Sequence, residues 1–64
     1  MNIQEIRKLL AENELEKAAE LSGYNSPKLQ KYMDLEDKPK SAQEHTDYLD
    51  LGDEIVREIL ELIK

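Results

Sequence analysis

Apolar residues recur every three or four positions along almost the whole chain, which is the spacing that places side chains on one face of a helix. No segment shows the alternation of apolar and polar residues, with a period of two, that a half-buried strand needs. The pattern therefore predicts an all-α fold, a small helical bundle of four to five short helices. A chain of 64 residues has room for one core, so residues 1–64 are expected to form a single domain.

Residues that favour helix ends divide the first half of this pattern. Asn2 is expected to cap a first helix, and Asn13 to end it, because asparagine tolerates the left-handed backbone conformation of a helix stop. Gly23 ends a short second helix by the same reasoning. Ser26 as N-cap and Pro27 at the first helical position begin a third helix. These signals predict three helices within residues 3–34.

Two further interruptions are expected in the second half. Pro39 pushes the residue before it out of helical geometry, and Ser41 with Glu44 forms the capping-box pattern that begins a new helix. Gly52 is expected to stop or kink that helix, with Asp53 capping a last one over residues 54–64. The sequence leaves open whether Gly52 kinks one helix or separates two.

The last predicted helix has more apolar residues than one small core needs, six in the eleven positions 54–64. Its first expected use is to close the core against the first helix. The excess width also predicts that a second helix packs on it, from another copy of the chain or from a partner protein. The predicted partner contacts are Ile55, Ile59 and Leu62 or, for a protein partner, alternatively the acidic residues that precede them.

The amino-acid composition argues against several classes of function. The chain has no cysteine, which excludes a disulfide framework and a cysteine-based zinc site. It has one histidine, no glycine-rich phosphate loop and no nucleophile motif, so we expect no enzyme and no cofactor. No apolar run approaches the roughly 20 residues of a membrane span, and no signal-peptide pattern is present, so we expect a cytoplasmic protein without a membrane partner.

A small residue and a glycine stand four positions apart at Ala19 and Gly23, where two helices joined by a tight turn would approach closely. Apolar residues that would dock the second helix on a core follow at Tyr24, Leu29 and Tyr32. In these features residues 15–33 resemble the helix-turn-helix class of DNA-binding transcription regulators. The preceding segment, residues 6–12, is similar to the helix that usually comes before this unit. The resemblance implies a trihelical, helix-turn-helix-like core over residues 3–34.

In that class the second helix of the unit lies in a DNA groove. The resemblance implies that the polar residues near its start contact duplex DNA, namely Asn25, Ser26, Lys28, Gln30 and Lys31. Independently, no acidic residue occurs between Glu20 and Asp34, in a chain where 15 of 64 residues are acidic. Both observations favour a small DNA-binding regulator, forming a homodimer through residues 54–64.

The overall charge favours a different class of function. The net charge is −6, and residues 41–64 alone carry −5, which is the wrong sign for contact with phosphates. The alternative is therefore an acidic helical protein–protein interaction module, an adaptor or an inhibitor of a basic partner protein. The sequence leaves open whether the partner is DNA or protein.

The second half of the chain contains a cluster of acidic residues that could be considered as a metal site. Asp47, Asp50, Asp53 and Glu54 lie close in sequence to His45, and carboxylates three positions apart on a helix can share a divalent cation. Their spacing matches no calcium loop. The expected structure is a solvated acidic helix face, and no metal site is predicted.

Overall fold

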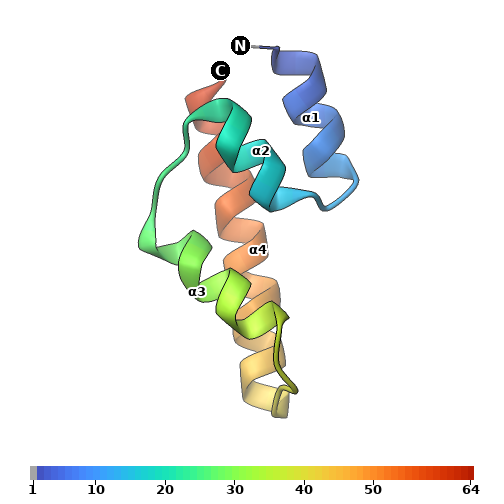
Figure 1. Ribbon diagram of the computed structural model, residues 1–64, viewed down its shortest axis with the longest axis vertical. Helices are drawn as coiled ribbons and strands as arrows, with labels where there is room; N and C mark the ends of the chain where they lie inside the picture. The colour runs from blue at the N-terminus through green and yellow to red at the C-terminus, as the bar shows by residue number, and fades with distance from the viewer. Residues whose placement is uncertain (1) are drawn as a thin grey trace.

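The computed structural model describes residues 2–64, and within that range the chain forms four α-helices and no strand. In chain order these are α1 (Ile3–Ala11), α2 (Leu15–Ser22), α3 (Pro27–Glu36) and α4 (Ala42–Leu62). Figure 1 shows α4 as the long axis of the molecule, with α2 and α3 against it and α1 beside α2. The prediction of an all-α small bundle is confirmed.

Two helices end in the left-handed turns that the sequence predicted. Asn13 has φ 61° after α1, and Gly23 has φ 75° after α2. In both turns the N–H of the following residue donates back into the helix, to the carbonyl oxygen of Leu9 at 2.8 Å and of Ala19 at 2.9 Å. These bonds satisfy carbonyl groups that a helix end leaves without a partner.

The helix starts predicted at Ser26 and Ser41 are also confirmed. The backbone N–H of Lys28 donates to Ser26 Oγ at 3.2 Å, so Ser26 caps α3. At the start of α4, the N–H of Glu44 donates to Ser41 Oγ and the N–H of Ser41 donates to Glu44 Oε1, both at 3.2 Å. This reciprocal pair is a complete capping box. The side chain of Lys38 pairs with Glu44 at 2.9 Å and ties the connection between α3 and α4 to this start.

Of the two alternatives left open at Gly52, two separate helices are excluded, and the prediction that Asp53 caps a new helix is wrong. Helix α4 continues through both residues, and Asp53 instead pairs with Arg57 at 3.0 Å within the helix. A Cβ atom at position 52 would lie 3.2 Å from Cε2 of Tyr32. Glycine here leaves room for the ring of Tyr32, which approaches the α4 backbone closely, and does not mark a turn of the chain.

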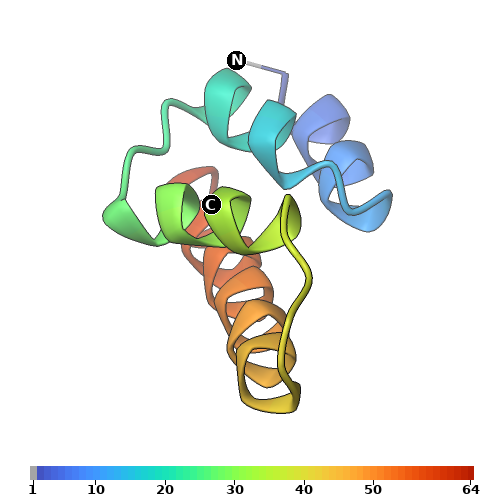
Figure 2. The same cartoon turned by 60° about the horizontal axis from the view of Figure 1, so that its bottom comes forward.

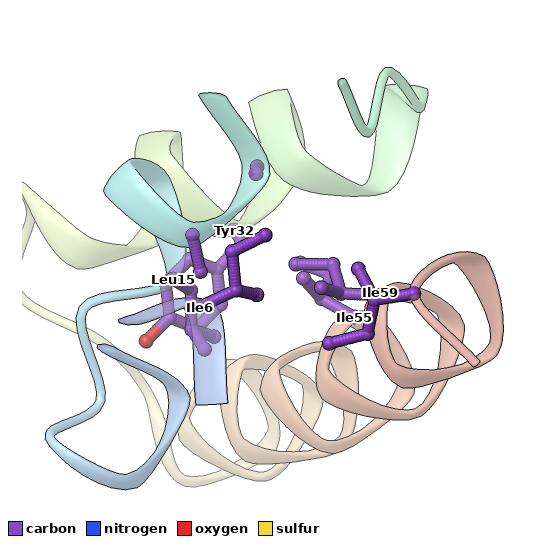
Figure 3. Close-up of a cluster of buried hydrophobic side chains, with 8 residues drawn as sticks. Ile6, Leu15, Tyr32, Ile55 and Ile59 are labelled. Atoms are coloured by element: carbon purple, nitrogen blue, oxygen red, sulfur yellow. The ribbon is translucent and has the colours of Figure 1, made fainter. Parts of the chain in front are cut away.

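The core lies where α1, α2 and α3 meet α4. The main interhelical contacts are α3 with α4, α1 with α2, and α2 with α4, an arrangement visible when Figures 1 and 2 are compared. The ring of Tyr32 also stacks on Tyr48, with 4.5 Å between ring centroids. The buried core residues, five of which are labelled in Figure 3, are Ile6, Leu15, Ala18, Ala19, Tyr32, Ile55, Ile59 and Ile63.

Candidate functional site

A row of carboxylates runs along one face of α4. Because this helix is continuous, acidic residues spaced by three and four positions fall on one side of it. From first to last the row spans roughly 21 Å at 1.5 Å per residue. We call it the acidic row; its members are Asp47, Asp50, Glu54, Glu58 and Glu61.

A lysine of α3 lies against the middle of the acidic row. The ammonium group of Lys28 donates to Glu58 Oε2 and lies 3.4 Å from Glu54 Oε2. The hydrogen bond that Lys28 donates to Glu58 raises the pKa of Lys28, and the same bond lowers the pKa of Glu58. Both groups are thus held in their charged forms, and the charge of Lys28 is directed at α4.

A tyrosine completes this cluster. The hydroxyl of Tyr24 donates to Glu58 Oε1 at 2.7 Å, so both carboxylate oxygens of Glu58 have a partner. Burial raises the pKa of the Tyr24 hydroxyl, which keeps it a proton donor at neutral pH. This contact joins the connection between α2 and α3 to the last turns of α4, across 34 positions of sequence.

The residues predicted to contact DNA have different surroundings from one another. Asn25 is exposed on the connection, and Ser26 uses its side chain to cap α3. Gln30 is exposed and donates to Asp34 Oδ1 at 2.9 Å. Lys28 faces α4 as described, and Lys31 lines a polar hollow whose other charged residues are Asp47, Asp50 and Glu54.

The predicted partner contacts on α4 need a correction. Ile55 and Ile59 have 0% of their surface exposed, because they form the centre of this chain's own core, and they are not available to a partner. Leu62 is 54% exposed and remains accessible. Its side chain lines a hollow between residues 23–26 and the C-terminal turns of α4, together with Glu58 and Glu61.

Sequence reasoning predicted a solvated acidic face in the first half of this row but missed its continuation to Glu58 and Glu61, and it missed the contact between Tyr24 and Glu58. The signal for the row was present in the three- and four-residue spacing of the carboxylates. It was obscured by the expectation that Gly52 interrupts the helix, which would have put Asp47 and Glu58 on separate segments. No local signal indicates the pairing of Tyr24 with a residue so far along the chain.

Two kinds of site are not found in the part of the chain that the structure describes. Among residues 2–64, no three or more histidine, aspartate and glutamate side chains are grouped so that they could hold a metal ion. Within the same range no helix has both the length and the apolar character to cross a membrane.

Comparison with protein-family models, with curated proteins and with solved structures finds no match to this chain.

Proposed function

We propose that this protein is a non-enzymatic, acidic helical interaction module that binds a basic segment of a partner protein through the acidic row. The observation that carries the proposal is the alignment of five carboxylates along one face of α4, against which residues 2–64 place only the lysines Lys28, Lys31 and Lys64. Their excess negative charge attracts a cationic partner and speeds its approach.

The placement of Lys28 supports a protein partner over DNA. Phosphate contacts supply most of the non-specific affinity of a DNA-binding protein, and each such contact needs a cation facing the duplex. Lys28 faces Glu54 and Glu58 instead, and carboxylates stand beside Lys31 in its hollow. A duplex approaching α3 would therefore meet carboxylates of α4 next to both lysines.

A DNA-binding regulator of the helix-turn-helix type stays the second candidate. It is favoured by one observation: Asn25, Gln30 and Lys31 are exposed near one another in sequence, without an acidic residue between them. Dimerisation through residues 54–64 belongs to this hypothesis, because two copies would double the phosphate contacts. Sedimentation at high concentration tests the dimer directly.

Parallel titrations distinguish the two candidates. The protein is titrated at low salt with a short lysine-rich peptide and, separately, with random-sequence duplex DNA, while amide spectra are recorded. We expect the peptide to shift amides between residues 47 and 61, and the shifts to shrink as salt is added. The double variant Asp47→Asn with Asp50→Asn is expected to weaken binding of the peptide severalfold.

The matched control removes the same charge elsewhere. Glu16→Gln with Glu20→Gln changes two exposed carboxylates of α2 and should leave peptide binding nearly unchanged. Equal losses in both double variants would show that only net charge matters and would overturn the acidic row as a site. DNA-induced shifts confined to residues 24–34, lost in Lys28→Glu with Lys31→Glu, would favour the DNA candidate instead.

A further inference from the structure

The hollow beside Leu62 differs from the rest of the acidic row because it combines acidic and apolar lining. It has a volume of about 560 Å³ and lies between residues 23–26 and the C-terminal turns of α4. This volume is within the range of pockets that hold small ligands or protruding side chains. Leu62 offers the apolar contact, and Glu58 and Glu61 place the end of the acidic row at the same hollow.

The walls of the hollow are held in position by interactions already made. The left-handed turn at Gly23 and the cap at Ser26 determine the course of the connection. The hydrogen bond from Tyr24 to Glu58 then fastens this connection to α4 at 2.7 Å. A preformed hollow loses little conformational entropy when it is filled, which favours binding.

Charge indicates which occupant fits. Glu58 is engaged by Lys28 and Tyr24, while the one ion pair of Glu61 within residues 2–64 is with Lys64, at 3.7 Å, with both side chains about three-quarters exposed. Such an exposed pair contributes little and is readily replaced. A second copy of this chain is a poor occupant because each copy carries a net charge of −6.

We propose that this hollow is the specificity site of the module and takes one large apolar side chain of a basic protein segment. The apolar side chain lies against Leu62 and the ring of Tyr24, and a neighbouring lysine or arginine of the partner pairs with Glu61. The inference rests on the proposed function, since the acidic row supplies the general attraction and the hollow selects among basic segments. It commits the partner to a cationic sequence interrupted by a leucine-sized residue.

Two synthetic peptides test this inference. One is a short run of lysines with a central leucine, and the other has alanine in place of the leucine. Affinities for the whole protein are measured by fluorescence anisotropy at fixed ionic strength. We expect the leucine peptide to bind about tenfold more tightly, which is the scale of burying the additional apolar surface.

Two variants locate the effect. Leu62→Ser is expected to abolish the preference for leucine, while Leu49→Ser is expected to retain it. Leu49 is the matched control because it is 57% exposed on the same helix and does not line this hollow. Both positions are exposed, so circular dichroism of each variant should show the native helical content. Glu61→Gln should weaken both peptides, and Glu20→Gln on α2 neither.

The outcomes separate this inference from the proposed function. If both peptides bind equally in a salt-dependent manner and shift amides of residues 47–54, the hollow is not a specificity site. The acidic row then remains the proposed binding surface for basic segments. A leucine preference that survives in Leu62→Ser overturns the assignment of the hollow in the same way. If neither peptide binds at low salt, both the inference and the proposed function fail.

Discussion

The ring of Tyr32 lies against the backbone of α4 at Gly52, so closely that a Cβ atom at position 52 would be 3.2 Å from Tyr32 Cε2. The ring has little freedom to move away, because it is buried and stacked on Tyr48. A helix that appears interrupted in the sequence is therefore continuous in the fold, and this continuity assembles the acidic row.

Substitution of Gly52 tests this contact. In an unhindered helix interior, glycine to alanine stabilises by roughly 1 kcal/mol. We expect Gly52→Ala to lose this gain and to destabilise by about 1 kcal/mol, since the new methyl group overpacks the site. Gly52→Leu should be clearly worse. Urea unfolding measures both, and a stabilised Gly52→Ala variant would show that the ring of Tyr32 moves aside freely.

The left-handed turn at Gly23 predicts a second stability effect. With φ at 75°, any residue with a Cβ is strained there, although open space surrounds the position. We expect Gly23→Ala to cost about 1 kcal/mol from backbone strain alone. Asn13 has a similar φ of 61°, so Asn13→Gly is the matched opposite change and should be neutral or mildly stabilising. The unfolding temperature should therefore fall in Gly23→Ala, and it should stay the same or rise slightly in Asn13→Gly.

The cap at Ser26 predicts that this side chain, which the sequence suggested as a DNA contact, contributes to the stability of the fold. Because Ser26 Oγ accepts a hydrogen bond from the N–H of Lys28, Ser26→Ala should destabilise the protein by about 1 kcal/mol. Ser26→Asp should retain the stability, since aspartate caps equally well and its charge suits a helix N-terminus. Chemical denaturation of both variants checks this, and an equal loss in the two would contradict the capping role.

The pairing of Lys38 with Glu44 predicts a dependence of stability on pH. The hydrogen bond from Lys38, followed by that from the Ser41 backbone, lowers the pKa of Glu44 from 4.5 to about 2. Because the pKa is lower in the folded protein than in the unfolded chain, Glu44 stabilises the fold above about pH 4.5. This contribution falls progressively as pH drops from there through about 2.

Carbon NMR of the Glu44 carboxyl group through an acid titration measures this pKa directly. Lys38→Met removes the first cause, so we expect the pKa of Glu44 to rise towards its ordinary value and the acid-dependent part of the stability to shrink. Lys8→Met, a change of an exposed lysine on α1, is the control that alters net charge equally. An ordinary pKa for Glu44 in the unaltered protein would contradict the pairing.

Local chemistry explains why much of the fold was predictable. The caps at Asn2, Ser26 and Ser41 and the turns at Asn13 and Gly23 depend on residues within a few positions of each other, and the structure confirms all five. Helical spacing of apolar residues similarly indicated most of the core. Ile55 and Ile59 were on the correct stripe, but spacing alone does not say whether that stripe faces its own core or a partner.

The candidate site was less predictable because it depends on contacts between distant segments. The positive charge around Lys28 suggested a surface for phosphates, but Glu54 and Glu58, at least 26 positions further along the chain, face the same ammonium group. Nothing near Gly52 in the sequence shows that the ring of Tyr32 occupies the space that a side chain at position 52 would need. Both relationships arise only when α3 packs on α4.

The amino-acid sequence by itself determined the helical class, the places where three helices begin and where two helices end, and the excess of negative charge. These follow from backbone capping, conformational preference and composition, which act over a few residues. The tertiary structure alone decided that α4 is one helix, that its carboxylates form a row, and that Lys28 is directed toward them. Those outcomes depend on how whole helices pack, because only packing brings Tyr32 to Gly52 and Tyr24 to Glu58.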